Sequence, residues 1–156
     1  MTKFVLFDLD GTLSDDRHRR YHAVAAHNGD KRAWNRYHQM AAFDDPVNLH
    51  LLDHHCRLGQ VPLFVTARPE EWRPITAAWL LRWVTLVLPE HRLLMRAREM
   101  SSLSSSEVKD RLLTEYPFQP GDHILHAYDD NPRVLDMYNS RGISTTLIEL
   151  PYDAPF

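Results

Sequence analysis

Apolar residues in this chain are gathered into short runs that alternate with longer stretches of mixed polar and apolar residues. The first run, Phe4-Val5-Leu6-Phe7, is unbroken, which is typical of a strand buried on both faces of a parallel sheet. The later runs are short in the same way and are bounded by turn-forming or charged residues. The pattern predicts five strands, at residues 3–9, 61–66, 92–95, 123–128 and 143–148.

The intervening stretches carry apolar residues at helical spacing. They predict helices at residues 17–27, 31–42, 46–58, 70–84 and 131–140, and a further helix that is capped by Ser105 or Ser106 and runs to about residue 116. Asn28-Gly29 separates the first two because it favours a turn. Large side chains recur in the fourth helix at core spacing, which favours packing over an exposed stacking platform: Trp72, Ile75, Trp79 and Trp83. Strands that alternate with helices predict a parallel sheet with right-handed crossovers.

The first apolar run ends in two carboxylates one residue apart, Asp8 and Asp10, followed by Gly11 and Thr12. Open α/β sheets bind their ligands at the carboxyl ends of strands, so these acids stand where a site is expected. Carboxylates this close repel each other unless a cation lies between them. A hard divalent ion such as Mg²⁺ prefers oxygen ligands. An ordinary Asp-Gly turn is the alternative that these residues leave open.

Composition narrows the class of protein. At 156 residues the chain is expected to form one domain, residues 1–156, with a core of its own. A net charge of −3 gives no global preference for nucleic acid. The single cysteine, Cys56, excludes an internal disulfide and fits a reducing, cytoplasmic compartment. We expect no signal segment, no membrane span and no obligate protein partner.

Four segments together resemble the motifs of the haloacid-dehalogenase (HAD) superfamily of phosphohydrolases. They are Phe7-Asp8-Leu9-Asp10-Gly11-Thr12, Leu63-Phe64-Val65-Thr66-Ala67-Arg68, Glu107-Val108-Lys109-Asp110 and His126-Ala127-Tyr128-Asp129-Asp130. They follow the order of the family, and three lie at the ends of predicted strands. The resemblance implies a three-layer α/β/α Rossmann-like sandwich with a parallel five-stranded sheet. Its first strand would lie between the second and the fourth, and residues 15–43 would form a small helical cap insert.

The resemblance also implies roles for the motif residues. Asp8 would be the nucleophile that forms an aspartyl-phosphate. Asp10 would be the general acid and then the general base. An acid at this position favours a reaction with an alkoxide leaving group, because an alkoxide needs a proton and a halide does not. Thr66 would hydrogen-bond the transferring phosphoryl group, and Lys109 would neutralise it. Gly11 would allow a tight turn.

A magnesium site is implied by the same motifs. Asp8, the backbone carbonyl of Asp10 and Asp130 would hold Mg²⁺. Asp129 would be a further or an alternate ligand, and the sequence leaves open which of the two final acids touches the metal. Thr12 would fix the loop with its hydroxyl, although a plain turn residue is an equal alternative.

A closer similarity covers about the last two thirds of the chain. Those residues resemble the phosphatase domain of phage polynucleotide kinase-phosphatases and their stand-alone relatives. The shared stretches are Val65-Thr66-Ala67-Arg68, Leu93-Leu94-Met95-Arg96, Val108-Lys109, and Asp129-Asp130-Asn131-Pro132-Arg133-Val134 with Met137-Tyr138. The similarity implies that Arg68 and Arg96 contact a substrate phosphate. A serine-rich stretch at 101–106 replaces acidic and basic residues of the relatives, and the chain has no phosphate-binding loop of a kinase.

Two local patterns have competing interpretations. Arg17-His18-Arg19-Arg20-Tyr21-His22 is a basic patch that could hold a nucleotide phosphate or a nucleic-acid end, or be a solvated helix face. His50, His54, His55 and Cys56 have the spacing of a zinc site, but an amphipathic helix is favoured.

These observations predict a magnesium-dependent phosphomonoester hydrolase whose substrate is a phosphorylated small molecule, in particular a nucleotide, or a nucleic-acid 3′-phosphate end. The alternatives are a phosphatase of sugar phosphates or other small metabolites, and a non-catalytic binding relative of the fold. The insert at 15–43 is the region that would distinguish substrates, because cap elements select them.

Overall fold

The computed structural model describes residues 1–41, 45–47 and 58–150. Its strands are β1 Lys3–Phe7, β2 Val61–Pro69, β3 Leu93–Arg96, β4 His123–Asp129 and β5 Ser144–Leu147. Its α-helices are α1 Arg20–His27, α2 Ala33–Met40, α4 Arg73–Trp83, α5 Ser105–Glu115 and α6 Pro132–Ser140. Short 3₁₀ turns are η1 Arg17–Arg19, η2 Glu70–Trp72, η3 Glu90–Arg92 and η4 Arg98–Met100. The helix expected at 46–58, with the histidines of the zinc alternative, lies outside the described residues except at its ends.

The five strands form one parallel sheet in the order β3-β2-β1-β4-β5. The predicted α/β class and the central place of β1 between β2 and β4 are confirmed. Because all strands run the same way, the carboxyl ends of β1, β2 and β4 meet at one edge of the sheet.

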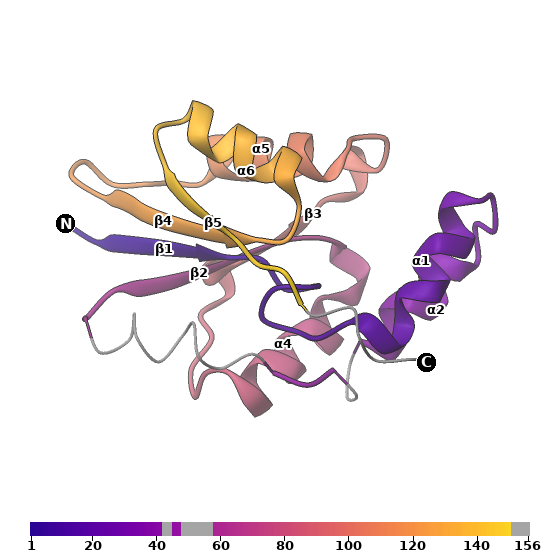
Figure 1. Ribbon diagram of the computed structural model, residues 1–156. Coiled ribbons are helices and arrows are strands. Elements are labelled where there is room, and N and C mark those ends of the chain that lie inside the picture. The colour runs from indigo at the N-terminus through magenta and orange to yellow at the C-terminus, as the bar shows by residue number, and fades with distance from the viewer. Residues whose placement is uncertain (42–44, 48–57, 151–156) are drawn as a thin grey trace.

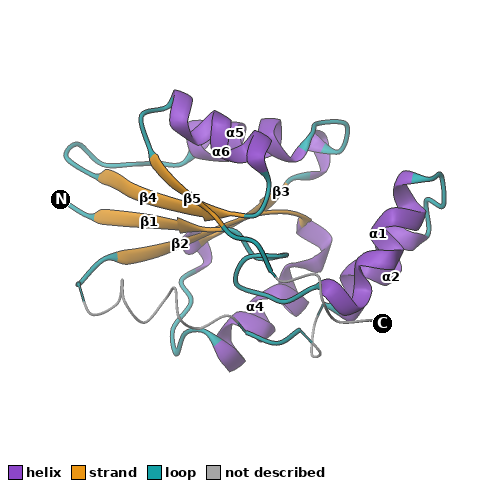
Figure 2. Cartoon of the chain, in the orientation of Figure 1, coloured by secondary structure: helices purple, strands orange, loops and turns teal. Residues whose placement is uncertain are grey.

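Helices cover both faces of the sheet: α5 and α6 lie on one side and α4 on the other (Figure 1; Figure 2). The unbroken apolar run of β1 accounts for this arrangement. Phe4 and Leu6 belong to the core cluster that includes residues of α5 and α6, whereas Val5 and Phe7 belong to the cluster around Trp79 of α4. Alternate residues of a strand point to opposite faces, so a strand in the middle layer must be apolar throughout.

The tryptophan stripe of α4 is only partly a core feature. Trp79 is fully buried, but Trp83 is 44% exposed. Trp83 is the last residue of α4, so it lies where the helix leaves the sheet.

Two helices, α1 and α2, form a hairpin between β1 and β2 that extends away from the sheet (Figure 1). They occur where the insert was predicted. Gly29 makes the turn between them with a φ of +106°, a conformation that glycine adopts readily. None of the described helices is long and apolar enough to cross a membrane.

The N-terminus of α5 differs from the prediction by one or two residues. Ser104, rather than Ser105 or Ser106, is the N-cap: its Oγ accepts from the Glu107 main-chain N–H at 3.3 Å. The Glu107 side chain in turn accepts from the Ser104 N–H at 2.8 Å. The glutamate decides which serine caps the helix, because a capping box needs an acid three residues after the cap.

Candidate active site

Three carboxylates converge at the carboxyl ends of β1 and β4. Asp8 directly follows β1, Asp129 ends β4, and Asp130 comes next. One oxygen from each lies within 4.8 Å of the others. Asp8 and Asp129 are almost completely buried. The parallel pairing of β1 with β4 brings them together, although 121 positions separate Asp8 from Asp129 in the sequence.

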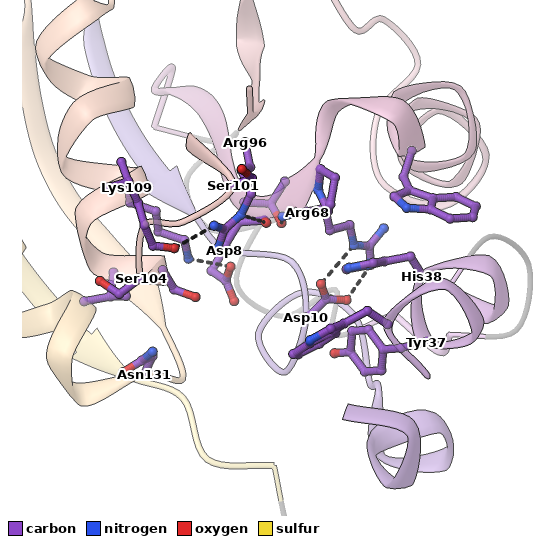
Figure 3. Close-up of a pocket in the computed structure, with 18 of the residues that line it drawn as sticks. Asp8, Asp10, Tyr37, His38, Arg68, Arg96, Ser101, Ser104, Lys109 and Asn131 are labelled. Carbon is purple, nitrogen blue, oxygen red and sulfur yellow. Dashed lines mark hydrogen bonds and ion pairs between the residues drawn. The ribbon is translucent and has the colours of Figure 1, made fainter. Parts of the chain in front are cut away.

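Lys109 reaches this cluster from α5. Its Nζ donates to Asp8 Oδ1 and to Asp129 Oδ2, each at 2.6 Å (Figure 3). Lys109 is only 2% exposed. A buried ammonium is costly unless it is paired and hydrogen-bonded, and two carboxylates provide both here.

The cluster carries more negative than positive charge. Burial and the neighbouring Asp129 raise the pKa of Asp8 well above its ordinary value. The same two causes raise the pKa of Asp130 to about 7. Burial alone would lower the pKa of Lys109, but Asp129 and Asp8 outweigh it and the pKa is raised. One ammonium therefore stands against three carboxylates, which is the donor set and the charge imbalance that a hard divalent cation relieves.

The loop after β1 is built to admit these side chains. Gly11 has a φ of +81°, and a Cβ at this position would lie 2.2 Å from Asp130 Oδ2 and 2.8 Å from Arg20 Nη2. Only glycine leaves room for the Asp130 carboxylate. Thr12 donates from Oγ1 to Asp8 Oδ2 at 3.0 Å, so the loop hydroxyl orients the second oxygen of Asp8.

Asp10 lies outside the cluster of three acids. Its Oδ2 accepts from Arg68 Nε at 2.9 Å, and its Oδ1 accepts from Arg68 Nη2 at 2.6 Å and from Arg19 Nη2. Burial opposes ionisation, but Arg68 and Arg19 hold the pKa of Asp10 well below its ordinary value. The carboxylate turns to these guanidiniums because two forked cations bind it more strongly than a cluster that is already negative.

Thr66 and Arg68 both come from β2, which runs past Thr66 to Pro69. Thr66 is buried, lines the cavity beside Asp8, and its Oγ1 accepts from the Arg68 main-chain N–H at 3.2 Å. Arg68 is also buried, and its Nη1 donates to Thr76 Oγ1 at 3.2 Å. In this conformation the guanidinium of Arg68 faces Asp10 (Figure 3).

Arg96 also faces the protein. Its Nε donates to the Ala67 carbonyl at 2.9 Å, and its Nη1 donates to the carbonyls of Met100 at 3.0 Å and Leu103 at 2.6 Å. Because these carbonyls belong to the strand before it and to the loop after it, Arg96 positions the serine-rich loop that borders the cavity.

Asp45 is a part of the site that sequence reasoning missed. It is buried, and it accepts from Arg19 at 2.8 Å on Oδ1 and at 2.5 Å on Oδ2. Arg19 is completely buried, donates to the Tyr37 carbonyl at 3.2 Å, and lies over the Tyr37 ring. Asp45 lies 26 positions after Arg19 in the sequence, and no local pattern links the two residues.

The arginines of the basic patch at 17–22 are paired with carboxylates in the structure. Arg17 pairs with Asp15, and Arg20 pairs with Asp16 at 2.8 Å. Arg19 is enclosed by Asp10 and Asp45. Four carboxylates therefore neutralise these arginines. Asp15 and Asp16 come just before the patch in the sequence, and the other two are those of Asp10 and Asp45.

An open cavity of about 1310 Å³ lies between the acidic cluster and the hairpin. Its walls include the serine loop, the start of α6, and aromatic residues of α2 and η2. Arg98 of η4 and Arg133 of α6 both line it and are exposed. Within the described ranges, no carboxylate is ion-paired with either.

The chain matches the HAD-type family described as the phosphatase domain of polynucleotide kinase PNKP over residues 2–149. No curated protein matches it. Two structures of the Pnkp1/Rnl/Hen1 complex, one described as an RNA repair complex, are 21% identical, with TM-scores of 0.66 and 0.69. The alignments cover 96% of this chain and 43% and 46% of theirs, so it spans less than half their length.

A Class C acid phosphatase from Bacillus anthracis with tungstate bound has a TM-score of 0.63 at 15% identity. That alignment covers 97% of this chain and 68% of the phosphatase. Identities this low show a shared fold.

Proposed function

The chain belongs to the HAD-type family of polynucleotide kinase PNKP phosphatase domains, and we propose that it hydrolyses phosphomonoesters of nucleotides or nucleic-acid 3′ ends with Mg²⁺ through an aspartyl-phosphate. That it is a phosphatase follows from the family; the metal, the intermediate and the substrate are the proposal. One observation carries it: Asp8 lies beside two further carboxylates and is held by a buried lysine.

The residues present fit a divalent cation. Both oxygens of Asp129 already accept hydrogen bonds, Oδ2 from Lys109 and Oδ1 from the Asn131 N–H at 3.0 Å. Among the described residues, Asp130 has only a looser pairing, with Arg20 at 3.6 Å. We therefore assign Asp130 to Mg²⁺ ahead of Asp129, and Asp129 as the group that positions Lys109. Both oxygens of Asp8 also accept hydrogen bonds, so Asp8 and the Asp10 carbonyl are assigned to Mg²⁺ from the motifs of the family instead. The ion would neutralise phosphate oxygens as the phosphoryl group is transferred.

In the first step an oxygen of Asp8 attacks phosphorus, the bond to the leaving oxygen breaks, and Asp8 becomes an aspartyl-phosphate. Lys109 and Thr66 stand beside Asp8 to neutralise and hydrogen-bond the transferring oxygens. In the second step water attacks phosphorus, and the carboxylate of Asp8 is released.

Asp10 gives a proton to the leaving oxygen in the first step and takes one from water in the second. The arginines hold it ionised, which is the form that the second step needs. A substrate phosphate that draws Arg68 toward itself would leave Asp10 with less positive charge and allow it to take up the proton that the first step needs.

The preference for nucleotides or nucleic-acid ends is supported by the cavity. Pockets that hold whole small-molecule ligands typically span roughly 300–1,000 Å³. This cavity is larger than that range, so it has room for more of a substrate than its phosphate group. Arg98 and Arg133 stand at its edge without a carboxylate partner in the described chain. They replace residues 17–20 as candidates for contact with further phosphates.

The test is a phosphatase assay with Mg²⁺, with chelator and with Mg²⁺ restored, on nucleotides, sugar phosphates and 3′-phosphorylated oligonucleotides. We expect chelator to abolish turnover and the 3′-phosphorylated nucleotides to give the highest kcat/KM. Full turnover in chelator would overturn the mechanism. Equal or faster turnover of sugar phosphates would overturn the substrate assignment.

An oligonucleotide substrate adds a salt test. The double variant Arg98→Gln/Arg133→Gln should reduce the dependence of log KM on log salt by roughly one to two, because each lost phosphate contact removes about 0.7 from that slope. The matched control is Arg82→Gln/Arg111→Gln, two exposed helix arginines outside the cavity lining. If both double variants behave alike, the two cavity arginines do not contact the substrate.

A further inference from the structure

We infer that the aromatic wall of the cavity, formed by Trp34, His38 and Trp72, binds the nucleobase of the substrate's terminal nucleotide. This inference rests on the proposed function and extends it, because it assigns the part of the substrate that the hairpin recognises. The wall is made by two elements far apart in the sequence, α2 of the hairpin and η2 after β2.

The three rings form a continuous ladder. The ring of His38 stacks on Trp34 with centroids 5.8 Å apart and planes 18° apart. The ring of His38 also contacts Trp72, with centroids 6.0 Å apart and planes inclined at 35°. Trp34, His38 and Trp72 all line the cavity that holds Asp8 and Lys109. In the view of Figure 3, His38 lies beyond Asp10 from Lys109, at the hairpin end of the site.

Two ring nitrogens of this wall, His38 Nδ1 and Trp72 Nε1, are buried and have no hydrogen-bond partner among the described residues. His38 is only 8% exposed. Buried polar atoms are nearly always hydrogen-bonded, so these two atoms point to a group that arrives with a ligand. A nucleobase carries flat faces for the rings together with donors and acceptors for the two nitrogens.

The charges of the cavity separate a phosphate end from a base end. Lys109 lies at the acidic cluster, and Arg98 and Arg133 border the serine-rich side. Glu70 and Glu71 line the cavity next to Trp72. Burial, and then the charges of Arg68 and Arg19, lower the pKa of His38 to about 4, although Asp10 opposes them. The wall therefore offers neutral rings beside carboxylates, which disfavours a phosphate and suits an uncharged planar group.

The experiment compares thymidine 3′-monophosphate with its abasic counterpart, the same sugar phosphate without the base, each also placed at the 3′ end of a short oligonucleotide. The readout is the ratio of kcat/KM for the base-bearing and the base-free substrate. The ratio is insensitive to the fraction of active protein, so a variant that folds less well still gives a valid value.

We expect the wild-type protein to prefer the base-bearing substrate by roughly tenfold or more, the size of a base–aromatic stack. Trp34→Leu should reduce this ratio toward one. Trp72→Phe, which keeps a ring but loses the N–H donor, should reduce it by a smaller factor. Trp83→Leu is the control: Trp83 is exposed, lies outside the cavity lining, and should leave the ratio unchanged.

Equal losses on both substrates would overturn the inference, because the ladder would then only brace the hairpin. A wild-type ratio near one would also overturn it. If the wild-type protein hydrolyses hexose phosphates but neither member of the pair, the proposed function fails. Calorimetry with the Asp8→Asn protein then decides the inference by itself: tighter binding of thymidine 3′-monophosphate than of the abasic compound supports it, and equal or absent binding overturns it.

Discussion

Asp8 and Asp10 lie two residues apart in the loop after β1, and their carboxylates have oppositely charged neighbours. Asp8 lies among acids that share one lysine, and burial with the repulsion of Asp129 raises its pKa. Asp10 lies against Arg68 and Arg19, which lower its pKa despite its burial. The first centre has more negative than positive charge, whereas the carboxylate of the second is neutralised by two arginines of the protein.

The difference explains how one loop can supply two kinds of chemistry. A nucleophile needs an ionised carboxylate close to a negative phosphate, which requires a cation that is present when the substrate is present. A general acid and base needs a carboxylate whose protonation can change during the cycle. Such a change would follow if the substrate phosphate draws Arg68 away from Asp10. We expect perturbations of the two centres to differ in size and in kind.

The largest effect is expected from Asp8→Asn. It should lower kcat by about 10⁴-fold or more, because the nucleophile is lost. The same substitution removes one of three repelling carboxylates while Asp129 still pairs with Lys109, so the unfolding midpoint without metal should not fall. Steady-state kinetics and thermal denaturation measure the two quantities; a substantial residual kcat would show that another group attacks phosphorus.

Asp10→Asn should have a smaller effect that depends on the substrate. With alkyl phosphates, whose leaving oxygen needs a proton, the first step should slow by about 10²- to 10⁴-fold. With nitrophenyl phosphate, whose leaving group scarcely needs one, that step should slow much less. Rapid-quench measurement of leaving-group release separates the cases, and equal slowing on both would show that Asp10 is not the acid.

Gly11→Ala tests the packing of the Asp8 centre. The added Cβ would meet Asp130 Oδ2 at 2.2 Å, so the carboxylate must move and the apparent affinity for Mg²⁺ should fall by about 10- to 100-fold. Gly142→Ala is the matched control, since Gly142 also has a positive φ but no atom within 4 Å. It should cost about 1 kcal/mol of stability and leave the metal dependence unchanged. Equal metal dependence in both variants would exclude the steric explanation.

The smallest effect is a dependence of stability on pH. The folded protein binds a proton on Asp130 with a pKa of about 7, against 3.8 in the unfolded chain. Without metal, Asp130 should therefore make the free energy of unfolding fall as the pH rises from about 4 to about 7. The raised pKa of Asp8 acts in the same direction. The pKa of His38, lowered to about 4, opposes this fall up to the ordinary value of 6.5, and the lowered pKa of Asp10 opposes it only below 3.8. Urea denaturation at pH 5 and 7.5 measures the net change, and Asp130→Asn should make it less negative; an equal change in that variant would assign it to other groups.

Much of the fold was readable from the sequence because its signals are local. The unbroken run of β1 and the alternation of strands with helices predicted the sheet. Glycine and paired acids at strand ends predicted the edge where Asp8 and Asp129 meet. The error at the start of α5 was also local: Glu107 identifies Ser104 as the cap.

The rest depended on contacts between distant residues. Nothing near Arg19 in the sequence indicates that Asp45 will enclose it, so the basic patch looked exposed. The aromatic wall joins α2 to η2 only after the chain folds, and the spacing of Trp72 in its own segment indicated only core packing. Pairings of this kind follow from tertiary packing rather than from a periodic pattern.

Mass spectrometry of the Asp10→Asn protein tests whether Asp8 becomes phosphorylated during turnover. This variant lacks the base of the second step, so an aspartyl-phosphate formed from nitrophenyl phosphate should accumulate. After acid quenching, we expect a phosphoryl group on the peptide that contains Asp8, present with Mg²⁺ and absent with chelator. Steady turnover by this variant with no phosphoryl group on Asp8, or a phosphoryl group on another residue, would contradict it.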